Sequence, residues 1–267
     1  MITVLVSIFG LIVGSFLNVV ILRHGSTPLA INNTGKSVFK GRSRCFACGH
    51  VLEWHELIPL ISFFMQKGRC RSCGAFISWQ YPIVEFLTAM VFLLIWLKIP
   101  SNFQFSIFSF QLLGFGIWYL IFCLLVVISV YDFRTKIIPD RFVYPLIALS
   151  IGYAFLFARA TFFADAIAAI SAAAFFTLLW LISRGRWIGF GDAKLTLGIG
   201  FFLGWPLIMV ALLAAFWSAA LVGVGLVALK GYTRKSEIPF GPFLALSAST
   251  AFLIGEKILL WYGGIVL

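Results

Sequence analysis

The chain has 267 residues, of which 62% are hydrophobic and only 11% are charged. A mean hydropathy of +1.06 is too high for a soluble domain of this length, so the composition excludes an ordinary soluble protein and indicates a membrane protein. The formal net charge of +11 raises nucleic-acid binding as an alternative, but no soluble basic domain remains to carry it. No nucleic-acid partner is therefore expected.

Eight apolar segments are predicted to cross the membrane, so the expected fold class is an all-α polytopic membrane protein. Three of them lack acidic and basic side chains and can each span a hydrocarbon core of roughly 30 Å. These three are residues 1–22, 105–131 and 206–229. Five segments are shorter or less uniformly apolar, namely 83–97, 142–157, 162–183, 195–205 and 243–261.

The basic residues predict the orientation of these segments. All of them except Lys98, Arg159 and Lys257 fall in four stretches that eight crossings place on one side of the membrane. By the positive-inside rule this side is cytoplasmic, and the amino terminus lies outside. Omitting the short segment 195–205 would put the basic cluster at 230–235 on the outer side, so we keep this segment as a crossing.

Four cysteines lie between the first and second segments, as two C-x-x-C pairs with 21 residues between the pairs. Two such turns can supply four thiolates to one tetrahedral zinc ion, which leaves no open position for catalysis. Two disulfides are the alternative, which a reducing cytoplasm disfavours. We therefore predict a first transmembrane helix at 1–22, a small cytoplasmic zinc-binding domain at 23–82 and a helical membrane domain at 83–267. The predicted ligands of this structural zinc are Cys45, Cys48, Cys70 and Cys73.

Two of the nine acidic residues, Asp132 and Asp192, fall at the same cytoplasmic edge of the predicted bundle. Two carboxylates that converge in a partly dry site cannot both ionise easily, so one keeps a proton while the other acts as a base, as in aspartic proteases. Gly189 and Gly191 would let the backbone approach a substrate or a neighbouring helix closely. The alternative is that Asp132 ends one helix in solvent and that Asp192 caps the next.

The other acidic residues give weaker signals. Glu85 enters the second predicted segment and must either reach the interface or find a partner, so its role stays open. Asp140 fits a helix cap better than a chemical role. Glu56 is interpreted as an ordinary surface charge, and Asp165 as an uninformative residue on the outer side.

These motifs together resemble the type IV prepilin peptidases, which are leader peptidases and N-methyltransferases of type IV pilus and type II secretion systems. The resemblance covers nearly the whole chain. Its matching segments are, in chain order, 14–21 with Arg23, the two C-x-x-C pairs, 58–59, 68–70, 81–85, Asp132 with 138–140, 189–194 and 238–242.

The resemblance implies that Asp132 and Asp192 are the catalytic pair, with Gly189, Gly191 and Lys194 as supporting residues. It implies that a prepilin or pseudopilin enters from the membrane lipid and is cut after the glycine that ends its short basic leader. The cut is expected at the cytoplasmic face of a bacterial inner membrane.

Methyl transfer to the new amino terminus is also implied, with S-adenosylmethionine as the donor. The sequence does not reveal the binding site of this donor, and Gly68 is the candidate that the resemblance offers. The turn at 239–242 is expected near the catalytic pair, and the oligomeric state stays open.

Two alternatives remain at this point. A leader peptidase without methyltransferase activity is one, although the intact cysteine pairs argue against it. A proton-coupled transporter is the other, since several spans and a few carboxylates suit that function as well. Transporters usually hold such carboxylates near the bilayer midplane, whereas Asp132 and Asp192 lie at its edge.

Overall fold

The computed structural model describes residues 1–24, 41–99, 110–228 and 238–266, and this described part contains helices and no strands. Its eight long helices correspond to the eight predicted segments, so the all-α fold class is confirmed. Among the described residues, seven helices are long and apolar enough to cross a membrane, and α7 (Phe190–Leu203), with 14 residues, is shorter than these. The basic cluster at 230–235 lies outside the described residues.

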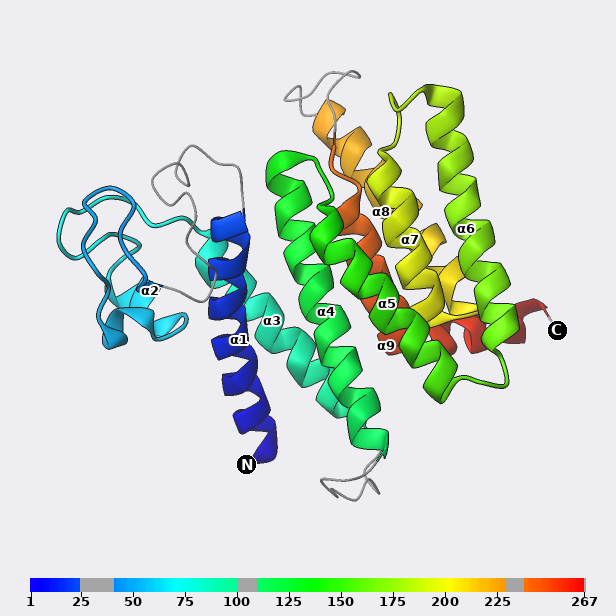
Figure 1. Cartoon of the computed structure of the whole chain (residues 1–267), viewed down its shortest axis with the longest axis horizontal. Coiled ribbons are helices and arrows are strands. Elements are labelled where there is room, and N and C mark those ends of the chain that lie inside the picture. Colours follow the sequence, from blue (N-terminus) through cyan, green and yellow to red (C-terminus); the bar gives the residue numbers. More distant parts are fainter. Residues whose placement is uncertain (25–40, 100–109, 229–237, 267) are drawn as a thin grey trace. The chain divides into compact units, whose positions relative to one another are not determined.

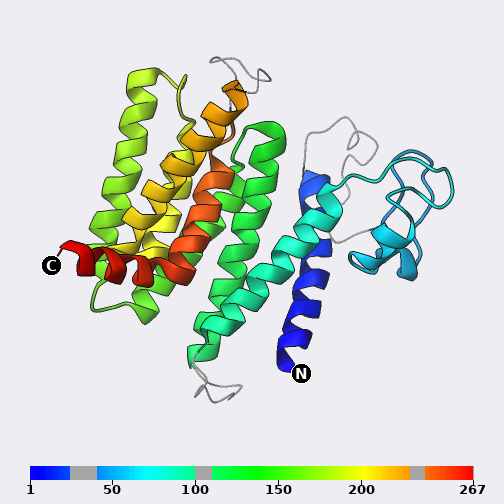
Figure 2. The same ribbon diagram turned by 180° about the vertical axis from the view of Figure 1, so that it is seen from behind.

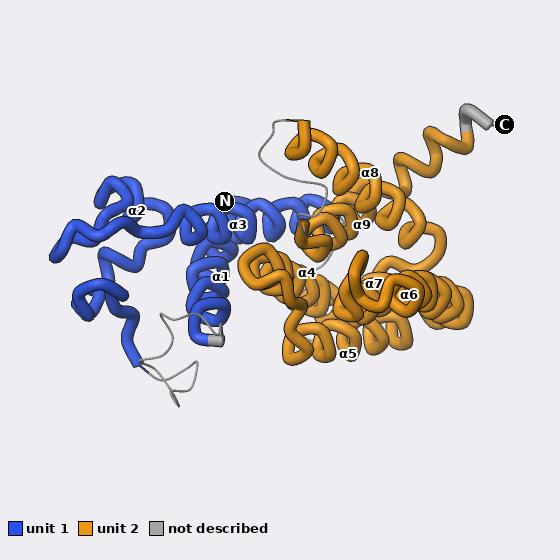
Figure 3. The backbone as a smooth tube through the Cα atoms, turned by 90° about the horizontal axis from the view of Figure 1, so that it is seen from above, with its two compact units in different colours: residues 1–103 blue, residues 104–267 orange. Residues whose placement is uncertain are grey.

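The chain divides into two compact units, residues 1–103 and 104–267 (Figure 3). In the first unit, α1 (Ile2–His24) packs along α3 (Gln80–Lys98). Gly10 and Gly14 of α1 make this possible, because a Cβ on either glycine would lie 2.7 Å from a Cα atom of α3. Small residues at such a spacing let two membrane helices approach backbone to backbone.

Between α1 and α3 the chain forms a module with two similar turns, a 3-10 helix η2 (Trp54–Leu57) and a short helix α2 (Ile61–Met65). In each turn the backbone N–H of the first cysteine donates to a carbonyl five residues later, at 2.8 Å. Gly49 and Gly74 follow the cysteine pairs with φ of 72° and 71°, a conformation that glycine adopts without strain. The same local fold is therefore built twice.

The second unit contains α4 (Phe110–Thr135), α5 (Asp140–Phe157), α6 (Phe162–Ser183), α8 (Leu207–Ala228) and α9 (Gly241–Val266) besides α7. Helix α7 is its centre, because it packs against α5, α6, α8 and α9 and most of its residues are buried (Figures 1 and 2). The rings of Phe122, Phe202 and Phe252 join α4, α7 and α9, with centroids 5.1 to 5.7 Å apart. Protein side chains, rather than lipid, thus surround the shortest of these helices.

Helix α7 approaches its neighbours closely through two glycines. A Cβ on Gly198 would overlap the side chain of Leu146 in α5, and one on Gly200 would lie 2.6 Å from the Cα of Ala169 in α6. This packing brings one end of several helices together. The carboxyl end of α4 and the amino ends of α5, α7 and α9 all lie at the upper end of the unit in Figure 1.

The interpretation of Glu56 as a surface charge is wrong, and Asp165 has a structural role that the sequence did not indicate. Glu56 is not a surface charge, because only 6% of it is exposed and its Oε2 accepts a hydrogen bond from the N–H of Glu53 at 2.9 Å. Asp165 is buried as well, and it accepts hydrogen bonds from the Thr161 hydroxyl at 2.7 Å and from the Trp205 N–H at 2.9 Å. Asp165 therefore fixes the turn between α7 and α8.

We predict that Gly14→Ala destabilises the first unit by about 1–3 kcal/mol, because the new methyl group overlaps the backbone of Glu85. The matched control is Gly116→Ala in α4, where a Cβ meets no atom within 4 Å, so that the higher helix propensity of alanine leaves stability equal or slightly raised. Thermal unfolding in detergent measures both variants. Equal unfolding temperatures for the two variants would contradict the close packing of α1 on α3.

Candidate active site and cysteine cluster

Asp132 lies in the last turn of α4 and is buried, with 4% of its surface exposed. Its Oδ2 accepts a hydrogen bond of 2.9 Å from the backbone N–H of Gly241, the first residue of α9. This carboxylate is therefore held by a helix that begins 109 residues later in the chain. The turn expected near the site, at 239–242, directly contacts Asp132.

Asp192 lies in the first turn of α7 and is also buried, with 7% exposed. Its Oδ2 accepts a hydrogen bond of 3.1 Å from the N–H of Gly189, and its buried Oδ1 has no partner within the described part of the chain. Both aspartates lie at the same end of the unit, where α4 ends and α7 begins (Figure 1). The unit thus brings together, from α4 and α7, the two aspartates that the sequence singled out.

The glycines beside Asp192 have different surroundings. A Cβ on Gly191 would lie 2.8 Å from the Cβ of Ile138, in the loop between α4 and α5, so the missing side chain allows a close approach. Gly189 precedes α7 as its N-cap with φ of −75°, and a Cβ there would meet only an ordinary contact. Gly189 contributes its backbone N–H to Asp192.

Lys194 follows the second aspartate on α7 and forms an ion pair with Asp140, in the first turn of α5. Its Nζ also lies 5.4 Å from the ring centroid of Tyr144 and 5.3 Å from that of Phe190. Such contacts are typical of a cation held against aromatic faces. Lys194 therefore ties α7 to α5 beside the pair, and Asp140 is its partner.

In the first unit, the four predicted cysteines form a cluster. The Sγ atoms of Cys45, Cys48, Cys70 and Cys73 all lie within 4.8 Å of one another, and those of Cys45 and Cys73 are 3.8 Å apart. Four thiolates about 2.3 Å from one tetrahedral zinc ion would be about 3.8 Å from each other. The donor set and its spacing therefore fit one metal ion.

Without a cation the four thiols do not all ionise together. Hydrogen bonds from the backbone N–H groups of Cys73 and Ser72 lower the pKa of Cys70 to about 6. The N–H of Ala75 also lowers the pKa of Cys73, but the neighbouring Cys48, burial and the other thiols raise it to about 12 overall. Four thiolates can therefore coexist here only when a positive ion offsets their repulsion.

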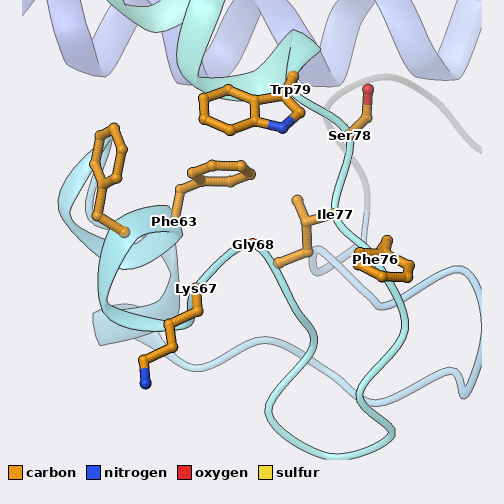
Figure 4. Close-up of a pocket in the computed structure, with 8 residues that line it drawn as sticks. Phe63, Lys67, Gly68, Phe76, Ile77, Ser78 and Trp79 are labelled. Atoms are coloured by element: carbon orange, nitrogen blue, oxygen red, sulfur yellow. The ribbon is translucent and has the colours of Figure 1, made fainter.

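A pocket of about 390 Å³ lies in the same module, beside α2 and before α3 (Figure 4). Phe63 and Trp79 form one wall, with ring centroids 5.0 Å apart. Gly68 forms part of the floor with φ of 66°, and a Cβ there would lie 3.2 Å from the ring of Phe63. The remaining lining residues are Phe64, Lys67, Phe76, Ile77 and Ser78.

Glu85 finds its partner within the first unit. It is buried in α3, and its Oε2 accepts a hydrogen bond of 2.8 Å from the N–H of Leu60, directly before α2. Asn18 of α1 is fully buried, and its side-chain amide donates a hydrogen bond of 3.2 Å to the carbonyl of Tyr81. Glu85 thus ties the module to α3, and Asn18 ties α1 to α3.

Comparisons with known proteins agree with the two halves of this arrangement. A family model described as the bacterial peptidase A24 N-terminal domain matches residues 8–99, and one described as the type IV leader peptidase family matches residues 119–224. A prepilin leader peptidase/N-methyltransferase of Aeromonas salmonicida is 31% identical over 97% of this chain and 92% of its own length. The chain belongs to the type IV leader peptidase family. The resemblance seen in the sequence is thereby confirmed.

Two further relatives of the leader peptidase family bear the same name. The protein of Bacillus subtilis is 30% identical over 96% of this chain and 95% of its own length. The protein of Pseudomonas aeruginosa is 30% identical over 94% of this chain and 90% of its own length. No solved structure matches the chain. Membership of this family makes the chain an enzyme and a multi-pass membrane protein, which leaves the transporter alternative without support.

Proposed function

We propose that this enzyme removes the leader from type IV prepilins or pseudopilins at the cytoplasmic face of a bacterial inner membrane, and that it then methylates the new amino terminus. The names of its relatives support both activities. The observation that carries the peptidase proposal is the pair of buried aspartates, Asp132 and Asp192, at one end of the second unit. The predominance of basic residues in the loops at that end supports a cytoplasmic location.

In the proposed mechanism the two carboxyl groups share one proton. The ionised member takes a proton from a water molecule, which attacks the carbonyl carbon of the scissile peptide bond. The protonated member donates a hydrogen bond to the carbonyl oxygen, on which negative charge develops. The tetrahedral intermediate then collapses, the C–N bond breaks, and the leaving nitrogen takes the proton that the base removed from water. The unpartnered Oδ1 of Asp192 supports this proposal, because it leaves one acceptor atom available for the water.

We predict that Asp132→Asn and Asp192→Asn each lower prepilin cleavage at least about 100-fold, because an amide cannot act as a general base. The matched control is Glu256→Gln, the same chemical change at an exposed carboxylate of α9, which should leave cleavage unchanged. Mass spectrometry of a purified prepilin substrate measures the product. Robust cleavage by either aspartate variant would refute the role of that residue.

We further propose that the cysteine cluster binds zinc in a structural role. The four sulfur donors and their spacing support this ion, and four thiolates leave it no open position. Bound zinc would cross-link the two turns of the module. Because no coordination position is open, the ion takes no part in the proposed cleavage.

The protein isolated without chelators should contain about one zinc ion per chain, and Cys45→Ser combined with Cys48→Ser should contain almost none. Removal of two thiolates destroys the tetrahedral site, whereas Cys123→Ser, in α4 and outside the cluster, should keep the zinc. Inductively coupled plasma mass spectrometry measures the metal content. A wild-type protein that contains no zinc would contradict the proposal.

For the methyltransferase activity we propose that S-adenosylmethionine binds in the pocket at Phe63, Gly68 and Trp79. When bound, this donor supplies an activated methyl group on a sulfonium cation. Aromatic rings suit both parts of such a ligand, because they stack on adenine and attract a cation. Gly68 has no side chain to occupy the pocket beside the ring of Phe63.

Trp79→Leu is expected to weaken binding of S-adenosylmethionine about tenfold, because one aromatic wall is lost. Trp54→Leu is the matched control, since Trp54 is similarly exposed but does not line the pocket. Isothermal titration measures binding directly, and cleavage of prepilin should be normal in both variants. Unchanged binding in Trp79→Leu would place the donor elsewhere.

A further inference from the structure

The first residue of α9 donates a buried hydrogen bond to a residue of another helix. The N–H groups in the first turn of a helix have no carbonyl partner within that helix. In α9 the N–H groups of Phe243 and Leu244 donate to the carbonyl of Phe240, at 3.1 Å each, and Pro242 has no N–H. The N–H of Gly241 instead donates to Asp132 at 2.9 Å.

Position 241 has no space for a side chain. A Cβ on Gly241 would lie 2.7 Å from Oδ2, 3.2 Å from Cγ and 3.3 Å from Cβ of Asp132, and these are the three nearest atoms. The φ of Gly241 lies outside the left-handed region, so the backbone itself does not demand glycine. What demands glycine at this position is the proximity of the Asp132 carboxylate.

We propose that Gly241 is a positioning residue for the cleavage reaction. Its N–H fixes one oxygen of Asp132, and its missing side chain leaves the space that this carboxylate occupies. This inference rests on the proposed catalytic role of Asp132. Helix α9 thereby sets the geometry of a catalytic pair that is itself contributed by α4 and α7.

The test is Gly241→Ala in the full-length protein, with Gly116→Ala as the matched glycine control. We expect kcat for prepilin cleavage to fall at least about tenfold, because the methyl group displaces the reacting carboxylate. The KM for prepilin and the methylation of a pilin that already lacks its leader should be unchanged. Normal cleavage by Gly241→Ala would overturn the inference, and so would an equal loss of cleavage and methylation.

A second measurement applies even if Gly241→Ala folds poorly. The double variant Gly241→Ala with Asp132→Ala removes the carboxylate that the new methyl group would meet, so it should unfold at a higher temperature than Gly241→Ala alone. Additive effects of the two substitutions would overturn the inference, because they would show that the residues are not coupled.

The outcomes also separate this inference from the proposed function. If Asp132→Asn cleaves normally, the catalytic role of Asp132 fails, and the role of Gly241 fails with it. If Asp132→Asn is inactive while Gly241→Ala is fully active, only the positioning role is lost.

Discussion

Two buried carboxyl groups, Asp132 and Asp192, at one end of the second unit are the constraint on which that unit depends. Burial of either group is costly unless donors or a proton compensate for the lost water. The structure supplies one backbone donor to each, from Gly241 at the start of α9 and from Gly189 at the start of α7. Both donors come from helix amino ends, where the backbone dipoles favour negative charge. The same glycines leave no side chain beside the pair.

The first unit solves a different problem. Between its two membrane helices lies a small polar module, whose described residues contain few buried apolar side chains from which to build a core. The cluster of four cysteines and the buried carboxylate of Glu85 provide fixed points instead. A small module of this kind is commonly stabilised by a metal ion. The pocket with Phe63, Gly68 and Trp79 lies within this module, which supports a division of the two proposed activities between the two units.

Features set by local pattern could be predicted from the sequence. The apolar run at 162–183 coincides with α6, and the spacing of the cysteines predicted a cluster that the structure contains. Individual hydrogen bonds between distant residues, and the exact start of a helix that other helices surround, could not be predicted. The segment predicted at 195–205 forms α7, which begins at Phe190 in the structure. Packing against other helices, and not a long apolar run of its own, stabilises this helix, so the apolar pattern did not indicate where it begins. The hydrogen bonds of Glu85, Asp165 and Asp132 join residues 25, 40 and 109 positions apart. The periodicity of apolar residues in the sequence does not indicate such pairs.

The central claim is that the side chains at 132 and 192 approach each other at one end of the helical unit. Cross-linking in native membranes tests it most directly, with Asp132→Cys and Asp192→Cys combined in a chain in which Cys123 is replaced by serine. A short bifunctional thiol reagent should join the two new cysteines, whereas the pair at positions 132 and 256 should not react. Efficient cross-linking only in the first pair is the result that the account predicts. Absence of that cross-link, in a protein that reacts with a monofunctional reagent at both positions, would contradict it.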